Sequence, residues 1–208
     1  MSTIGERIAA AYDRIAPDYA IINAAMPANL ATLGERFLAH LGPNPRVLDV
    51  GCGVGRDMAW MEARGAQVTG IDLSGGMLDL ARKTVHGPLL RMDMCRLALP
   101  TGQFDGVWCC ASLLHVPKAR AAEALVEMRR VLVPGGTLYL GLQEGEGEVW
   151  ESSGPFGAVE RLFARYTSDE AEALLGTGFT IDERGRDEAR TRHWLNMLAT
   201  APKTPSQD

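Results

Sequence analysis

Hydrophobic and polar residues follow two different patterns along the chain. Before residue 46, apolar residues such as Leu30, Leu33 and Phe37 recur at the spacing of one helix face. This spacing predicts helices across residues 1–45. Pro17 is expected to break or restart the first of them, because proline lacks the backbone N–H that a helix interior needs.

From residue 46 onward, short apolar runs are separated by amphipathic stretches. The runs predict strands over residues 46–50, 67–72, 89–93, 104–110 and 136–142. The clearest helix covers residues 118–132, where Ala121, Leu125 and Met128 lie on one apolar stripe. Apolar strands that alternate with helices indicate a parallel sheet with helices on both faces.

The C-terminal part of the chain has a third pattern. Residues 143–166 begin with QEGEGEVWESSGPFG, whose glycines and glutamates predict a loop or an insertion. A capping box from Thr167 to Glu170 predicts a helix that ends at Gly176. The stretches GFTIDERG and RHWLNMLATA are predicted strands, and they should pair antiparallel because the link between them is too short for a parallel crossover. The tail, residues 202–208, is expected to be flexible.

Composition narrows the choice of function. The 208 residues suggest one domain, and the net charge of −5 shows no basic footprint, so a nucleic-acid partner is not expected. No signal peptide is recognisable, and no apolar run approaches the roughly 20 residues that a membrane helix needs. The four cysteines form no CxxC pair and have no metal-ligand spacing. We therefore expect reduced thiols, no metal site, no membrane partner and a cytoplasmic protein.

A glycine turn follows the first predicted strand. Gly51, Gly53 and Gly55 precede a predicted helix, and such a turn brings bare backbone N–H groups and the positive end of a helix dipole to a ligand. Dinucleotide-binding proteins place a further glycine where this chain has Arg56. The next strand ends in Asp72, whose carboxylate can accept two hydrogen bonds from a ribose diol. The turn alone leaves a nicotinamide-dependent oxidoreductase open.

Six segments together resemble one family. In chain order they are VLDVGCGVGRD, VTGIDLSGGML, RMDMCRLALP, FDGVWCCASLLHV, EMRRVLVPGGTLYL and ARYTSDEAEALLGTGFTIDE. The chain resembles the class I S-adenosylmethionine-dependent methyltransferases of the small-molecule kind over roughly residues 7–201. The resemblance implies a three-layer, doubly wound Rossmann-like α/β fold, with a mostly parallel seven-stranded sheet and an antiparallel last strand. It also implies a helical lid over residues 1–45 and a core over residues 46–201, with a substrate-side insertion around residues 143–166.

The same resemblance implies a cofactor, S-adenosyl-L-methionine, with S-adenosyl-L-homocysteine as the product. The three turn glycines would lie under the methionine half, and Asp49 would brace the turn or reach the ammonium group through water. Asp72 would hold the ribose hydroxyls, and Asp93 would accept from the adenine amino group. The other implied cofactor contacts are Tyr19, Leu73, Met77, Met94, Cys110 and Ala111.

Most of these residues have a purely structural alternative. Asp72 can be a helix N-cap, although Ser74 already suits that position. Asp93 can be an ordinary loop carboxylate. Tyr12 and Tyr19 resemble lid residues that close over the cofactor, but half-buried core aromatics explain them equally well.

The implied reaction is a direct displacement that moves a methyl group to an oxygen, nitrogen or sulfur atom of a small molecule. His115 follows the fourth strand and is the candidate base or acceptor-orienting group, the alternative being a packing histidine bonded to nearby backbone. Tyr12 and Trp150 are further candidates for acceptor contact. Glu144, Glu146 and Glu148 could favour a cationic amine, or they could simply face solvent.

Two other functional classes remain open beside the oxidoreductase. The first is a non-catalytic module that only binds S-adenosyl-L-methionine. The second is an enzyme that uses this cofactor in a reaction other than methyl transfer. The sequence leaves the choice between a monomer and a homodimer open as well.

Overall fold

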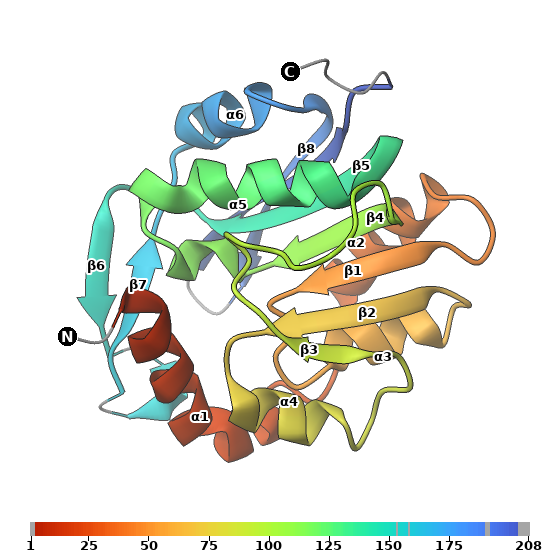
Figure 1. The fold of residues 1–208 in the computed structure, drawn as a ribbon. Coiled ribbons are helices and arrows are strands. Elements are labelled where there is room, and N and C mark those ends of the chain that lie inside the picture. The colour runs from red at the N-terminus through yellow and green to blue at the C-terminus, as the bar shows by residue number, and fades with distance from the viewer. Residues whose placement is uncertain (1–2, 153, 158, 190–191, 204–208) are drawn as a thin grey trace.

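The computed structural model describes residues 3–152, 154–157, 159–189 and 192–203. In this part of the chain, seven strands form one sheet in the order β3-β2-β1-β4-β5-β9-β8 (Figure 1). The five strands in its parallel part are β1 (Arg46–Val50), β2 (Gln67–Asp72), β3 (Leu89–Arg91), β4 (Phe104–Cys110) and β5 (Leu132–Gln143). Strand β9 (Arg192–Thr200) runs antiparallel to β5 and to β8 (Thr180–Ala189). The predicted fold class is confirmed.

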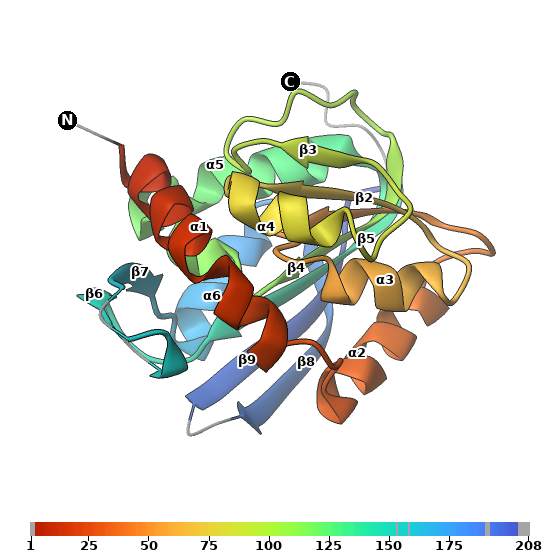
Figure 2. The same cartoon turned by 90° about the horizontal axis from the view of Figure 1, so that it is seen from below.

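Helices cover both faces of this sheet, as Figure 2 shows from below. Helix α5 (Lys118–Val131) and helix α6 (Ser168–Gly176) pack on one face through Leu125, Met128 and Leu175. Helix α2 (Ala28–Ala39) and helix α3 (Arg56–Glu62) pack on the other face, against Trp108 and Tyr139. Because the strands are buried on both faces, their sequences are continuous apolar runs without polar alternation. Helix α6 begins at Thr167, whose hydroxyl accepts from the Glu170 N–H in the predicted capping box.

Helix α1 (Ile4–Ile22) lies at the edge of the sheet where the parallel strands end. It packs against helix α4 (Gly75–Ala81), with Ile15 and Ala16 beside Met77. The Oδ1 atom of Asp13 accepts hydrogen bonds from the Ser74 hydroxyl at 2.6 Å and from the Gly76 N–H at 2.8 Å. These bonds fasten α1 to the N-terminal end of α4.

The prediction that Pro17 breaks this helix is wrong. Helix α1 continues through Pro17 to Ile22. A proline removes only one hydrogen bond from a helix, and packing holds the buried Ile15 and Ala16 before it and the partly buried Tyr19 after it. Tertiary contacts at Ile15, Ala16 and Tyr19 therefore outweigh the local penalty.

The prediction of a loop over residues 143–166 is also wrong in part. Strand β6 (Glu148–Glu151) and strand β7 (Arg161–Ala164) form a separate antiparallel pair, and a short 3₁₀ turn, η2 (Gly154–Phe156), lies between them. All four residues of β7 are buried. Their burial against α1 and the 3₁₀ turn η1 (Leu113–His115) gives this segment an ordered structure.

Two strand boundaries differ from the predictions in smaller ways. Strand β3 ends at Arg91, two residues early, and β5 begins at Leu132, directly after α5. Residues 204–208 of the predicted flexible tail lie outside the described residues. Within the described ranges, no helix combines the length and the apolar character needed to cross a bilayer.

Candidate cofactor and acceptor site

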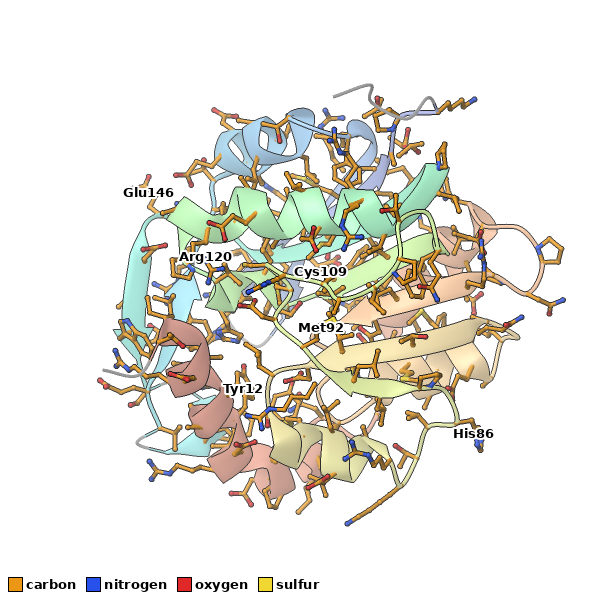
Figure 3. The ribbon with its side chains drawn as sticks, viewed as in Figure 1. Tyr12, His86, Met92, Cys109, Arg120 and Glu146 are labelled. Atoms are coloured by element: carbon orange, nitrogen blue, oxygen red, sulfur yellow. The ribbon has the colours of Figure 1, made fainter. Side chains whose placement is uncertain are left out.

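A cavity of about 330 Å³ lies between the strand ends and helix α1. We call it the edge cavity. Residues from four parallel strands and from α1 meet there, as expected for a ligand site at the carboxyl edge of a doubly wound sheet. The sequence-predicted residues that line it are Tyr12, Tyr19, Gly51, Gly53, Asp72, Leu73, Met77, Asp93, Met94, Cys110, Ala111 and His115. Figure 3 shows Tyr12 on α1 and Met92, a further lining residue, at the end of β3.

The glycine turn is held to the tip of β2. The N–H groups of Gly51 and Cys52 both donate to the carbonyl oxygen of Ile71, at 2.8 and 2.9 Å. The N–H of Gly53 donates to Oδ2 of Asp72 at 2.9 Å. The turn and the acidic residue therefore form one rigid unit, although 19 residues separate Gly53 from Asp72.

The three glycines of the turn have different physical roles. A Cβ atom on Gly51 would lie 2.3 Å from the Cβ of Ser112, whereas a Cβ on Gly53 would meet nothing closer than Tyr19, at 4.0 Å. Gly53 therefore borders open space in the edge cavity. A Cβ on Gly55 would lie 2.6 Å from a methyl group of Val85, so Gly55 allows α3 to approach the end of α4. Gly55 does not line the edge cavity, and its place under the methionine half stays a prediction.

This difference yields a paired prediction. Both glycines have positive φ, +74° at Gly51 and +55° at Gly53, so alanine costs about 1–2 kcal/mol at either position. Gly51→Ala adds a clash, and we expect it to lower the free energy of unfolding by about 2–5 kcal/mol in total. Gly53→Ala should cost only the smaller amount but weaken cofactor binding by at least about tenfold, because its methyl group occupies the cavity.

Chemical denaturation and calorimetric titration with S-adenosyl-L-homocysteine measure the two effects separately. Equal loss of stability in both variants would contradict the assignment of Gly53 to the cavity wall.

Asp72, at the end of β2, lines the edge cavity. Its Oδ1 accepts from the Ser74 N–H at 2.8 Å and its Oδ2 accepts from Gly53, which leaves a further lone pair on each oxygen. Burial raises the pKa of Asp72, and the backbone N–H donors oppose that rise. Ser74, not Asp72, caps α4, since the Ser74 hydroxyl accepts from the Met77 N–H.

Asp93 occupies a more open position. Its Oδ1 accepts from the Cys95 N–H at 2.9 Å, and Arg120 lies 3.9 Å from Oδ2. The carboxylate is therefore partly used by its own loop, although the residue still lines the edge cavity.

Asp49 is buried in β1, with 2% of its surface exposed. Its Oδ2 accepts no hydrogen bond from the described part of the chain, and Asp49 does not line the edge cavity. Burial raises the pKa of Asp49 well above the usual range, and the nearby Asp57 carboxylate raises it further. A buried acceptor without a donor is costly, so a donor or cation supplied by a ligand would stabilise this carboxyl group.

Tyr12 and His115 form a hydrogen-bonded pair between α1 and η1. The Tyr12 hydroxyl lies 2.5 Å from Nε2 of His115, and Nδ1 of His115 lies 2.6 Å from the carbonyl oxygen of Leu162. Since a carbonyl only accepts, Nδ1 carries the proton and Nε2 keeps its lone pair. Burial lowers the pKa of His115 to about 4, and the hydrogen bond to Leu162 opposes that change. The ring is therefore neutral at pH 7, and its Nε2 atom accepts the hydrogen bond of the Tyr12 hydroxyl.

A second cavity, of about 520 Å³, adjoins the first. We call it the aromatic cavity. Tyr12, Tyr19, Cys110, Ala111 and His115 line both cavities, so the two meet at the end of β4. Its further walls are contributed by α2, η2, β7 and the sheet strands β5, β8 and β9, and include Tyr139, Phe156, Arg161, Phe163, Asp187, Arg192, Trp194 and Asn196.

Trp150 and the three glutamates do not reach either cavity. The Trp150 ring lies under the guanidinium of Arg7, 3.8 Å from its centroid, which ties β6 to α1. Glu144 pairs with Arg186, and Glu146 is exposed at the periphery (Figure 3). Glu148 accepts from the Lys118 backbone N–H. The structure therefore offers no acidic wall for a cationic amine at these positions.

The residues of the insertion that do line the aromatic cavity were missed from the sequence. They are Pro155, Phe156, Arg161 and Phe163. The alternation in ERLFARY was the available signal for a strand, but nothing in the sequence placed that strand over the end of β4.

Comparison with known proteins agrees with this geometry. A family profile described as a methyltransferase domain matches residues 48–140. A demethylmenaquinone methyltransferase from Deinococcus radiodurans is 33% identical over 181 residues, which cover 82% of this chain and 72% of that protein. The chain belongs to the S-adenosylmethionine-dependent methyltransferases of class I. The cofactor of this methyltransferase-family chain is thus S-adenosyl-L-methionine.

Two further relatives show the breadth of the family. A Burkholderia thailandensis 1,6-didemethyltoxoflavin-N1-methyltransferase, solved with S-adenosylhomocysteine, superposes with a TM-score of 0.75 at 23% identity, over 97% of this chain and 92% of that one. This likeness shows the shared fold. An S-adenosyl-L-methionine-dependent Diels-Alderase from Talaromyces variabilis is 30% identical and aligns with 76% of this chain and 55% of its own length. Two other curated relatives, 36% and 34% identical, are longer proteins, of which the chain spans 44% and 58%.

The residues at the edge cavity fit this cofactor. Gly53 leaves open space where a side chain would block a ligand, and Asp72 retains lone pairs for a diol. The Oδ2 atom of Asp49 accepts no hydrogen bond from the described residues, but Asp49 does not line the cavity, so its predicted contact with the ammonium group through water stays a prediction.

Proposed function

We propose that the chain is an enzyme that transfers a methyl group from S-adenosyl-L-methionine to an oxygen or nitrogen atom of a small molecule, with sulfur as a less expected acceptor. The observation that supports this proposal is the meeting of the two cavities at Cys110, Ala111 and His115. One cavity carries the residues suited to the cofactor, and the other is large enough for a separate acceptor. An acceptor in the aromatic cavity would thus reach the cofactor at the end of β4.

When bound, S-adenosyl-L-methionine supplies a methyl group already activated on a sulfonium. The protein therefore needs to align the reactants and exclude water. Asp72 would hold the ribose and the Gly53 turn would lie under the methionine half, while Tyr12 and Tyr19 on α1 would close the space above them. Ala111 has a φ of +51° at the junction of the cavities, so its backbone turns sharply where main-chain groups would face the reacting atoms.

His115 would act on acceptors that arrive with a proton. Its neutral Nε2 now lies against the Tyr12 hydroxyl, and an acceptor hydroxyl at the same place would donate to that lone pair. As the new bond to the methyl carbon forms, Nε2 would take the acceptor's proton, and the hydrogen bond from Nδ1 to Leu162 would hold the ring in place. An amine acceptor with a free lone pair would need no such step.

The experiment that tests the function uses isotopically labelled S-adenosyl-L-methionine and a metabolite extract. We expect one or more small molecules to gain the label in step with S-adenosyl-L-homocysteine, and the Gly53→Ala variant to lower both signals together. A protein that binds S-adenosyl-L-homocysteine but forms none from the labelled donor would instead be a binding module or would catalyse a non-methyl reaction.

Membership of the methyltransferase family removes the nicotinamide-dependent oxidoreductase that the glycine turn alone left open. A cytoplasmic location, the absence of nucleic-acid and membrane partners, and a monomeric or homodimeric state stay as proposals.

A further inference from the structure

One row of residues across the sheet forms part of the floor of the aromatic cavity. Cys110 on β4 pairs with Gly141 on β5, and Gly141 pairs with Asn196 on β9. All three residues line the cavity. Neighbouring strands of a sheet lie about 4.8 Å apart, so Asn196 is about 10 Å from Cys110, where the two cavities meet. The floor therefore has a polar side chain at a fixed distance from the expected place of the reaction.

The middle and the sides of this floor suit a flat molecule. Gly141 has no side chain to rise between Cys110 and Asn196, and a Cβ atom there would lie 3.0 Å from the Tyr139 hydroxyl. The rings of Phe156 and Phe163 line the same cavity. Aromatic rings bind other planar rings through stacked or edge-to-face contacts. A planar ligand over Gly141 would reach Cys110 with one end and Asn196 with the other.

Asn196 belongs to a hydrogen-bonded chain with a fixed direction. The Tyr139 hydroxyl donates to Oδ1 of Asn196 at 2.7 Å, and Nδ2 of Asn196 donates to Oδ2 of Asp187 at 3.0 Å. A carboxylate only accepts, so the amide nitrogen of Asn196 faces Asp187 and its oxygen faces Tyr139. Asn196 is 7% exposed and Tyr139 is 1% exposed, so this chain of polar groups is largely shielded from water.

The chain retains hydrogen-bonding capacity for a ligand. The bond to Asp187 uses one of the two N–H groups of Asn196, and Asp187 keeps further lone pairs on its carboxylate. Backbone pairing already joins Asn196 to Gly141 and to Gly185, so cohesion of the sheet does not account for these polar side chains in the cavity. A free N–H beside a carboxylate is the complement of a group that has an acceptor atom next to a donor.

The charges of the cavity wall do not favour a charged ligand. The three arginines that line it, Arg56, Arg161 and Arg192, all interact within the fold. Asp187 is the one carboxylate among the described lining residues, and Asn196 donates to it. A cation would approach the arginines and an anion would approach Asp187, and each approach is unfavourable. A molecule without net charge avoids both.

We propose that the methyl acceptor is a flat, uncharged aromatic molecule that carries a hydrogen-bond acceptor beside a donor, as in a carboxamide or a lactam, on the side away from its reacting atom. Its acceptor atom receives the second N–H of Asn196 and its donor binds Asp187, while its reacting atom lies near Cys110 and His115. The inference rests on the proposed function for the methyl transfer. The polar site itself is defined by the two side chains, whether or not transfer occurs.

The test uses three probes that share a phenol ring: para-hydroxybenzamide, para-hydroxyacetophenone and para-hydroxybenzoate. The amide and the ketone differ only in an NH₂ group against a methyl group, so their comparison isolates the donor. Ligand-observed NMR measures binding to the full chain, with and without saturating S-adenosyl-L-homocysteine. We expect the amide to bind at least about tenfold more tightly than the ketone, because a hydrogen bond to a carboxylate is strong. The benzoate should bind less tightly than the amide.

Variants separate the two contacts. Asp187→Ala should lower the affinity of the amide to within about threefold of the ketone and leave the ketone unchanged, because only the amide donates. Asn196→Leu should weaken both probes by at least about fivefold, because both present a carbonyl oxygen. Gln143→Leu is the matched control, since this buried amide lies on β5 but lines neither cavity. Melting curves first check that each variant folds, and Asp187→Ala decides alone if Asn196→Leu does not.

Equal binding of the amide and the ketone would overturn the inference, as would tighter binding of the benzoate or no detectable binding of the amide at millimolar concentration. A preference for the amide that persists in Asp187→Ala would overturn it too, and so would equal losses in Asn196→Leu and Gln143→Leu. Failure of S-adenosyl-L-homocysteine to bind, titrated separately, would instead contradict the proposed function and leave the measured preference for the amide intact.

Discussion

Replacing His115 by alanine is expected to lower the turnover of a hydroxyl acceptor by about 100-fold. The reason is the position of its lone pair: Nδ1 donates to Leu162, so Nε2 faces the place where the two cavities meet. Without the ring, the acceptor keeps its proton while it attacks, and it also loses one orienting contact. Because His115 lies beside the cofactor and not on its ribose, binding of S-adenosyl-L-homocysteine should stay within about threefold of the wild type.

The measurement uses a hydroxyl acceptor identified with the labelled donor, and it records turnover and cofactor affinity in the same samples. Tyr12→Phe is the matched variant, since it removes the hydroxyl that meets Nε2 but keeps the aromatic ring. We expect a much smaller loss from it, because the freed Nε2 can still receive the proton. An unchanged rate in His115→Ala with unchanged cofactor affinity would leave His115 as a packing residue.

The pH dependence of protein stability provides a second test of the neutral state of His115. The pKa of His115 falls from 6.5 to about 4 on folding, so the unfolded chain binds the proton more readily than the folded protein. The neutral ring therefore stabilises the fold fully above about pH 6.5, and this contribution is lost as the pH falls toward 4. His115→Gln should show a smaller loss of melting temperature over this interval than the wild type.

Replacing Asp72 by alanine is expected to weaken cofactor binding by about 30- to 150-fold. Hydrogen bonds from a ribose diol to a carboxylate contribute on the order of 2–3 kcal/mol, and each 1.4 kcal/mol changes a binding constant about tenfold. Both oxygens of Asp72 are held in place by the Gly53 and Ser74 N–H groups, so the carboxylate is already oriented before a ligand arrives. The substitution also removes the hydrogen bond that holds Gly53 to the end of β2, which adds to the loss.

Calorimetric titration with S-adenosyl-L-homocysteine measures this effect. Asp72→Asn separates charge from shape, and it should lie between the wild type and Asp72→Ala. Asp79→Ala is the control, because this exposed carboxylate on α4 pairs with Arg82 and lines neither cavity. Wild-type affinity in Asp72→Ala would show that the ribose is bound elsewhere.

Local features of the chain predicted which residues meet at the edge cavity. The apolar run that ends in the glycine turn and the strand that ends in Asp72 are short segments, and parallel strands place their carboxyl ends at one edge regardless of other detail. Residues at successive strand ends therefore converge without any knowledge of side-chain packing. Gly55 is the exception, because only its neighbours Ala81 and Val85 show that it serves helix packing.

The residues of the acceptor side were predicted less well from the sequence. Trp150 was a predicted acceptor contact because of its aromatic ring, but it packs on Arg7. Arg161 and Phe163, from the same insertion, line the aromatic cavity instead. In a strand, neighbouring side chains point to opposite sides, so a small difference in register decides which of them reach a cavity. No local pattern sets that register for β6 and β7.

The sequence by itself determined the sheet, its helical cover and the cofactor edge, because hydrophobic periodicity and a strand-turn-helix motif act over a few residues. Only the tertiary structure decided the continuity of α1 through Pro17, the pairing of Tyr12 with His115 across 103 residues and the set of residues that line the aromatic cavity. These features depend on contacts between segments far apart in the chain. Their energies come from packing and desolvation, which no local stretch of sequence contains.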